Sequence, residues 1–229
     1  YQTVDGRTIR TYIGKHLPPH IQATVEGLQP IKKISVEREP EAQIRVFTLG
    51  QFRMERRAGS DSLDWETVND ALWQHQRVRS LLVCLVSNPH RKLGREQIVD
   101  MLWPDQTPEM AMGRLDRSVH SLRQIFEPDR RRAATSPLLL TERELITLAN
   151  QHNIWLDADA FEQLLIQARN SKDTGERERL IEEAVALYGG EFLPEERVLE
   201  STRLRRDALQ RAWVGALLEL ADLRVERQA

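Results

Sequence analysis

The stretch from residue 108 to residue 126 constrains the fold more than any other part of the sequence. Thr107 and Pro108 favour a helix start, because threonine can cap an N-terminus and proline is tolerated in the first turn. At about 100° per residue, one arc of this helix collects the apolar side chains of Ala111, Leu115, Val119, Leu122, Ile125 and Phe126. This stripe predicts an amphipathic helix that rests on a core, so its opposite face must be exposed.

The opposite face of this predicted helix is rich in long hydrogen-bond donors. Beyond Glu109 in the first turn, its only acid is Asp116. Its other residues are Met110, Gly113, Arg114, Arg117, His120, Ser121, Arg123 and Gln124. Arginine, histidine and glutamine side chains can reach base edges and phosphate oxygens in the major groove of DNA. The face is therefore either a DNA-reading surface or an ordinary solvated one.

Strands and a first helix are expected before this long helix. Residues 44–49 and 51–56 are β-prone on either side of Gly50, which suggests two strands joined at a tight corner. A further strand is expected near residues 65–68. The period then changes to that of a helix ending at Asn88-Pro89. The apolar face of that helix consists of Val78, Leu81, Leu82 and Leu85.

A shorter helix and a hairpin complete this part of the chain. The stretch Leu93–Trp103 stops at Pro104, and we expect Ile98, Leu102 and Trp103 to face inward. After the long helix, residues 137–141 and 145–148 are β-prone runs that flank Glu142-Arg143-Glu144. Strands, three helices and a wing hairpin in this order are typical of a winged helix-turn-helix, which predicts an α+β fold.

Two motifs resemble a known family. Residues Gly94–Pro104 (GREQIVDMLWP), followed by Arg114–Arg123 (RLDRSVHSLR), resemble the OmpR-type winged helix of SARP regulators, the Streptomyces antibiotic regulatory protein family. This resemblance covers about Ile44 to Leu148. Downstream, Ala186–Pro194 (ALYGGEFLP) resembles the bacterial transcriptional activator domain that follows the winged helix in that family.

The C-terminal part is expected to be all-helical. Residues 157–169, 176–188 and 201–224 have helical apolar spacing, and three helices of this length suit a tetratricopeptide-like stack. In the last stretch the apolar positions are Leu204, Ala208, Leu217, Leu220 and Leu223, with Trp213 outside strict register. The family's activator domain has more helices than fit before Ala229, so we expect its later part to be missing here.

We therefore expect three parts along the chain. Residues 1–42 form an N-terminal arm and linker, with a β-hairpin about Asp5-Gly6 and a short helix from His20 to Gly27. Residues 43–150 form the winged-helix domain. Residues 151–229 form the first helices of the activator domain.

The resemblance implies a transcriptional regulator, an activator, that binds double-stranded DNA sequence-specifically with the 108–126 helix in the major groove. The residues expected to touch DNA are Arg114, Arg117, Ser121 and Arg123 at base edges or groove walls, His120 and Gln124 as second choices, and Arg95 beside a phosphate. One such module buries only about 600 to 1,000 Å². We therefore expect paired copies on direct repeats, forming a homodimer on DNA, with the helical domain contacting a second protomer or RNA polymerase.

One feature of the sequence limits this expectation, and the role of three basic residues is left open. The acids Glu142 and Glu144 at the wing tip would be repelled by phosphates, which weakens any wing contact with the minor groove. The basic residues Arg79, Arg91 and Lys92 are either ordinary exposed residues or additional phosphate contacts.

Charge is distributed unevenly along the chain. The net charge is −2 and the isoelectric point is about 6.4, which by itself argues against a nucleic-acid binder. However, residues 77–132 contain 11 Lys and Arg against 7 Asp and Glu, whereas residues 150–229 contain 11 against 16. This asymmetry favours one part that faces phosphates and another that faces protein.

The alternatives come from other functional classes. A protein-interaction adaptor built on a winged helix that does not bind DNA would also explain Asp116 and the acidic wing. An enzyme is not expected, because no Gly-x-x-x-x-Gly-Lys loop is present, and Pro18-Pro19 separates the neighbouring histidines His16 and His20. We expect no metal or cofactor, a buried Cys84, no membrane-spanning segment and a cytoplasmic location.

Overall fold

The computed structural model describes residues 2–4, 7–9, 42–58, 64–129, 136–196 and 199–228. The chain divides into two compact units, Tyr1–Arg38 and Glu39–Ala229. In the first unit, β1 (Gln2–Val4) pairs antiparallel with β2 (Arg7–Ile9), which confirms the pairing expected of a β-hairpin. The helix expected from His20 to Gly27 lies outside the described residues.

The second unit begins with a four-stranded sheet of order β5-β4-β3-β9. Its strands are β3 (Ile44–Phe47), β4 (Arg53–Arg57), β5 (Trp65–Thr67) and β9 (Ile154–Leu156). The first three pair antiparallel, as the alternating pattern predicted, while β9 adds a parallel strand beside β3. The sequence reading missed β9, because a strand of three residues carries almost no periodic signal.

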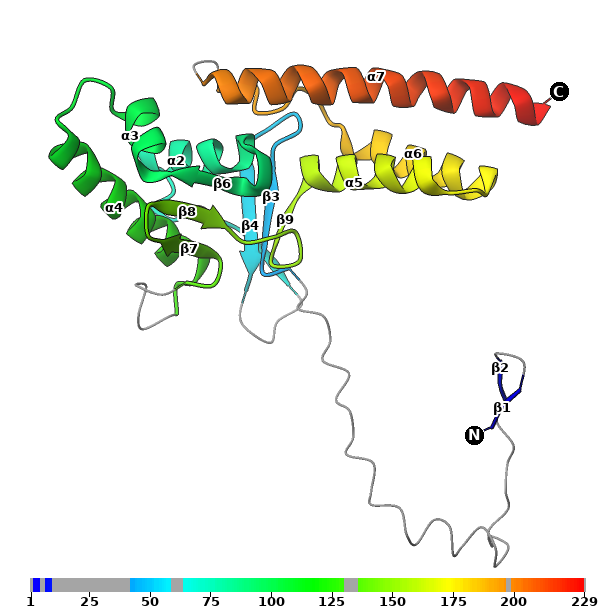
Figure 1. Cartoon of the computed structure of the whole chain (residues 1–229), viewed down its shortest axis with the longest axis horizontal. Helices are drawn as coiled ribbons and strands as arrows, with labels where there is room; N and C mark the ends of the chain where they lie inside the picture. The colour runs from blue at the N-terminus through cyan, green and yellow to red at the C-terminus, as the bar shows by residue number, and fades with distance from the viewer. Residues whose placement is uncertain are drawn as a thin grey trace, which may run out of the picture. The chain divides into compact units, whose positions relative to one another are not determined.

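Three helices pack against one another beside this sheet (Figure 1). They are α2 (Gln76–Ser87), α3 (Arg95–Leu102) and α4 (Pro108–Phe126). All six apolar residues predicted for the inner stripe of α4 are buried, and so are the inner residues predicted for α2 and α3. The α2 helix is central, since every residue from 81 to 87 is buried. Thr107 takes the N-cap position of α4, although its hydroxyl makes no capping hydrogen bond.

The wing is a three-stranded sheet of order β6-β8-β7. A short 3₁₀ turn, η1 (Pro89–Arg91), leads into β6 (Lys92–Gly94), which was not predicted. The predicted hairpin is confirmed as β7 (Leu139–Glu142) and β8 (Leu145–Leu148), which pair antiparallel around a two-residue turn.

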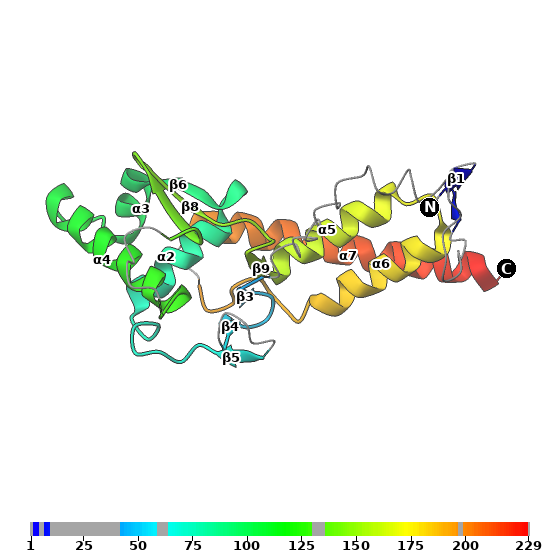
Figure 2. The ribbon, with the colours of Figure 1, turned by 90° about the horizontal axis from the view of Figure 1, so that it is seen from below.

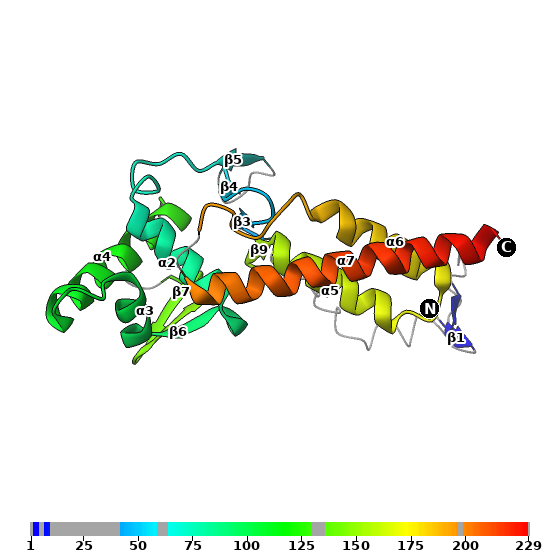
Figure 3. The same cartoon turned by 90° about the horizontal axis from the view of Figure 1, so that it is seen from above.

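The remaining helices are α5 (Asp157–Asn170), α6 (Thr174–Leu187) and α7 (Glu200–Gln228). Figure 3 shows α7 running alongside α5 and α6 and reaching α2, and α7 packs against all three helices. The buried face of α7 agrees only in part with the predicted apolar positions. Leu220 and Leu223 are buried as predicted, but Leu204, Ala208 and Leu217 are exposed, and Leu209 and Ala216 are buried in addition. The helix has more apolar residues than one face needs, so its neighbours decide which of them are covered.

The helical part is joined to the winged helix through buried polar contacts. The Asp157 carboxylate, at the start of α5, accepts hydrogen bonds from the Thr48 backbone N–H (2.8 and 2.9 Å), the Thr48 hydroxyl (2.6 Å) and the Leu49 N–H (2.9 Å). Burial raises the pKa of Asp157, and these hydrogen bonds oppose that shift. Ser87 of α2 and Thr202 of α7 share a hydrogen bond of 2.9 Å. The structure is thus an α+β fold in which a winged helix is followed by a helical part.

Candidate nucleic-acid interface

The outer face of α4 projects from the winged helix (Figure 2). Arg117, His120 and Gln124 are exposed on it, and Arg114 and Ser121 are half-buried at its margin. The Arg117 Nε donates to the carbonyl of Gly113 at 3.2 Å, one turn earlier on the same helix. These five residues, predicted as DNA contacts, therefore lie on a convex ridge of one rigid helix.

Arg95 and Asp116 join α3 to α4 at the edge of this ridge. The Arg95 guanidinium, largely buried, lies 2.5 Å from the Asp116 carboxylate. An acid on a DNA-facing helix opposes phosphate approach, but an ion pair with a neighbouring arginine offsets part of its charge. Asp116 thus links α4 to α3 from an exposed position, and Arg95 is engaged with α4 rather than projecting alone toward a phosphate.

Arg123, predicted as a DNA contact, points toward the wing. Its Nε and Nη2 donate to the carbonyl of Leu139 on β7 at 3.0 and 2.9 Å, and Nη2 also donates to the Thr141 hydroxyl at 2.9 Å. Burial lowers the pKa of this guanidinium, and the negative charge of Glu127 opposes that shift. The structure therefore separates Arg123 from the exposed residues of the ridge.

The wing turn contributes a residue that sequence reasoning did not single out. Arg143 is exposed and has a positive φ of 53°, and it stands between the exposed acids Glu142 and Glu144. The Glu144 carbonyl accepts a hydrogen bond from the backbone N–H of Arg95 at 2.8 Å, which ties the turn to the start of α3. The β-prone runs around it predicted the turn, but no pattern in the sequence indicated that Arg143 would be its exposed basic residue.

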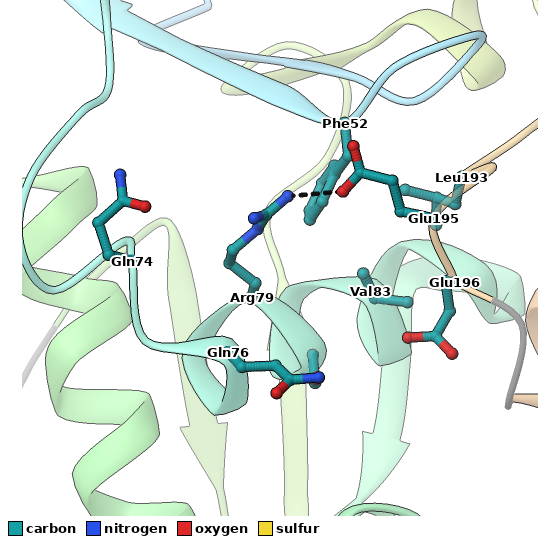
Figure 4. Close-up of a pocket in the computed structure, with 9 residues that line it drawn as sticks. Phe52, Gln74, Gln76, Arg79, Val83, Leu193, Glu195 and Glu196 are labelled. Carbon is teal, nitrogen blue, oxygen red and sulfur yellow. Dashed lines mark hydrogen bonds and ion pairs between the residues drawn. The ribbon is translucent and has the colours of Figure 1, made fainter.

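Two basic residues considered as extra phosphate contacts have other roles. Arg79 pairs with Glu195 at 3.1 Å beside the Phe52 ring, at the rim of a pocket of about 320 Å³ (Figure 4). Arg91 is only 6% exposed, so the expectation that it is either a surface residue or a phosphate contact was wrong. Lys92 is exposed on β6, and its contact with DNA remains a prediction.

Arg91 is buried because its partners come from later in the chain. It donates to the carbonyls of Ala149 (2.9 Å) and Ile154 (2.8 Å), to the side chain of Gln151 and to the carboxylate of Asp159. The sequence around Arg91 does not predict hydrogen-bond partners that lie some sixty residues later in the chain.

Comparison with known sequences and structures agrees with this geometry. Residues 70–144 match the sequence family described as "Transcriptional regulatory protein, C terminal". The matched stretch contains α2, α3, α4 and the wing turn, and it indicates a DNA-binding transcriptional regulator. No curated protein matches the sequence.

A solved structure that resembles the chain is Mycobacterium tuberculosis EmbR in complex with a low affinity phosphopeptide. The two are 19% identical with a TM-score of 0.62, over 81% of this chain and 46% of the EmbR chain. The chain thus spans about half the length of that relative. At this identity the likeness shows the fold alone, and it supports a winged helix followed by a helical part.

No helix in the described ranges is both long and apolar enough to cross a bilayer. Within the same ranges, no group of three or more His, Cys, Asp or Glu is placed to hold a metal ion.

Proposed function

We propose that this chain is a SARP-type transcriptional activator that recognises a specific double-stranded DNA sequence with α4 in the major groove. The observation that carries the proposal is the division of α4 into two faces. Its apolar stripe is fully buried, while Arg117, His120 and Gln124 project from the other side. A helix seated in this way presents its polar side chains together to base edges and phosphates.

The residues proposed to contact DNA fall into two groups. Arg114, Arg117 and Ser121 are the first candidates for base edges or groove walls, with His120 and Gln124 next. Arg95, although paired with Asp116, would lie near a phosphate at the entrance of the groove, beside the first turn of α3. The boundary after residue 150 is proposed as the division between the DNA-reading part and the helical part, and not as the end of an independently stable fragment.

Paired binding is proposed because one winged helix covers little DNA. A single module buries about 600 to 1,000 Å² of protein surface, which is modest for tight specific binding. Two copies on direct repeats would double this area. The helical part, α5 to α7, would then contact the second protomer or RNA polymerase. We propose a cytoplasmic location, because the promoter DNA lies there.

The experiment begins with selection of bound sequences from a random pool of duplex DNA, which gives the motif and the repeat spacing. Fluorescence anisotropy on the selected duplex then compares the wild type with Arg117→Ala. We expect a loss of about 5- to 150-fold, the range for one good arginine contact. Arg211→Ala, which removes the same charge from an exposed position on α7, is the matched control on a duplex with a single copy of the motif, where no second protomer binds, and should leave affinity for that duplex unchanged.

Unchanged affinity of Arg117→Ala, with an unchanged circular dichroism spectrum, would reject α4 as the reading helix. Selection of no sequence at all from the pool would favour the alternative function, a protein-interaction adaptor. The exposed acids Glu142 and Glu144 on the wing favour this alternative, because they would be repelled by DNA phosphates.

A further inference from the structure

Strand β7 forms one edge of the three-stranded wing sheet. Among the described residues, strand β7 pairs with β8 alone and so ends the order β6-β8-β7. The carbonyl of Leu138 accepts from the Ala149 N–H at 2.9 Å, so it points toward the β8 side. Successive carbonyls of a strand point in opposite directions, which places the carbonyl of Leu139 on the free edge. An unpaired edge of this kind needs a partner or solvent.

Arg123 of α4 occupies that edge. Its guanidinium makes three hydrogen bonds there, two to the Leu139 carbonyl and one to the Thr141 hydroxyl, all between 2.9 and 3.0 Å. Leu139 and Thr141 are two residues apart, so their carbonyls point to the same edge and their side chains to the same face, and one guanidinium contacts both residues. A planar guanidinium spans such a pair, whereas a lysine ammonium reaches as a single point.

The other side of the wing is tied to the same helix through α3. The Glu144 carbonyl, in the wing turn, accepts from the Arg95 N–H at 2.8 Å, and the Arg95 guanidinium pairs with Asp116 of α4 at 2.5 Å. The connections form a closed ring from α4 to β7, through the turn to α3 and back to α4. Figure 1 shows these elements grouped together.

We propose that Arg123 is a positioning residue, which locks the wing to α4 so that the reading helix and the Arg143 turn meet DNA as one rigid body. This inference rests on the proposed DNA function, and it replaces the expected base contact of Arg123. Three hydrogen bonds tie Arg123 to the wing, while Arg117 and Gln124 on the same helix remain exposed. Fixing the wing in advance removes an ordering cost from DNA binding.

Salt dependence separates positioning from contact. Removing a phosphate contact lowers the slope of log K against log salt by about 0.9, whereas removing a positioning residue lowers affinity and leaves the slope unchanged. We expect Arg123→Met to bind the selected duplex about 10-fold more weakly with the wild-type slope, roughly the effect of 1.4 kcal/mol. We expect Arg123→Lys to lose nearly as much, because lysine keeps the charge but not the planar fork.

A double-mutant cycle with Thr141→Val tests the partner directly. If Arg123 acts through Thr141, the Thr141→Val change should matter less for DNA affinity in the Arg123→Met background than in the wild type. A duplex shortened on the side met by the wing should likewise weaken the wild type more than Arg123→Met. Thermal melts confirm that each variant is folded at the assay temperature.

Three results would overturn the proposal: wild-type affinity in Arg123→Met, a salt slope reduced by about one contact, or full rescue by Arg123→Lys. Hydrogen exchange in the free protein gives a readout that needs no DNA. Arg123→Met should speed exchange of the amides between Leu139 and Leu148, while Arg117→Met should not. Unchanged exchange in Arg123→Met refutes the tie itself, even if the protein binds no DNA.

Discussion

At the residue scale, several arginines of this chain hold the structure together. Arg91 directs its hydrogen bonds to the loop and helix that follow the wing, and Arg205 of α7 meets the same Asp159 carboxylate. Charged side chains are rarely this buried unless each donor has a partner. His90 and Arg91 also have positive φ values of 59° and 52°, which are uncommon for residues other than glycine.

Cys84 is a residue whose chemistry is set by its surroundings. It is buried in the middle of α2, and burial, together with the negative charge of Glu196, raises its pKa from 9.0 to about 12. The folded state therefore favours the neutral thiol. The contribution of this thiol to the free energy of unfolding is fully present below pH 9. It is lost as the pH rises toward 12, because the unfolded chain gives up the thiol proton more easily than the folded protein.

We predict that the folded protein resists alkylation by iodoacetamide at pH 8.5, because only the thiolate reacts. Protein unfolded in urea at the same pH should be modified quickly, since its thiol returns to an ordinary pKa. Mass spectrometry of the two samples after equal times measures the difference. Equal labelling of folded and unfolded protein would show that Cys84 is accessible.

At the scale of elements, a glycine contact explains part of the motif Ala186–Pro194. Gly50, at the corner between β3 and β4, has a φ of 93°, and a Cβ placed there would lie 2.9 Å from the backbone of Gly189. The Gly50 N–H donates to the Glu191 carbonyl at 2.9 Å. The corner of the sheet and the loop after α6 thus approach so closely that neither tolerates a side chain.

We predict that Gly50→Ala destabilises the protein by about 2 kcal/mol or more, because it combines a left-handed backbone with overlap in a packed contact. Gly215→Ala is the control, since nothing lies within 4 Å of the added Cβ in the middle of α7. That change should stabilise the protein by up to about 1 kcal/mol through helix propensity. Urea unfolding at equilibrium measures the free energy of unfolding of both variants. A loss of less than about 0.5 kcal/mol for Gly50→Ala would contradict the close approach.

At the scale of the whole second unit, the winged helix depends on residues beyond the wing. Strand β9 pairs with β3, Asp157 satisfies the backbone of Thr48 and Leu49, and α7 packs on α2. Removing these residues would expose apolar side chains of β3 and α2 to water and would replace buried hydrogen bonds by hydration, which weakens the winged helix.

We predict that a fragment of residues 42–150 is much less stable than a fragment of residues 42–228, although both contain the whole wing. A fragment of residues 42–170, which keeps β9 and α5, should recover part of the loss. Thermal unfolding followed by circular dichroism compares the three. Equal melting temperatures for the shortest and longest fragments would show that the winged helix is independent and would support a domain boundary after residue 150.

The sequence determined the parts of this protein that depend on local periodicity. The six-residue stripe of α4 and the inner faces of α2 and α3 follow from spacing alone, because a helix places every third or fourth residue on one side. The wing hairpin and the exposed ridge with Arg117, His120 and Gln124 followed from the same patterns.

Tertiary structure alone decided where the long side chains of Arg91 and Arg123 end, and which apolar residues of α7 are covered. An arginine has reach and many donors, so its partner depends on whichever carbonyl or carboxylate the fold brings close. Ala149 and Asp159 lie 58 and 68 residues beyond Arg91, and Leu139 lies 16 beyond Arg123. Local sequence patterns do not predict such contacts, because the contacts form only when distant elements pack together.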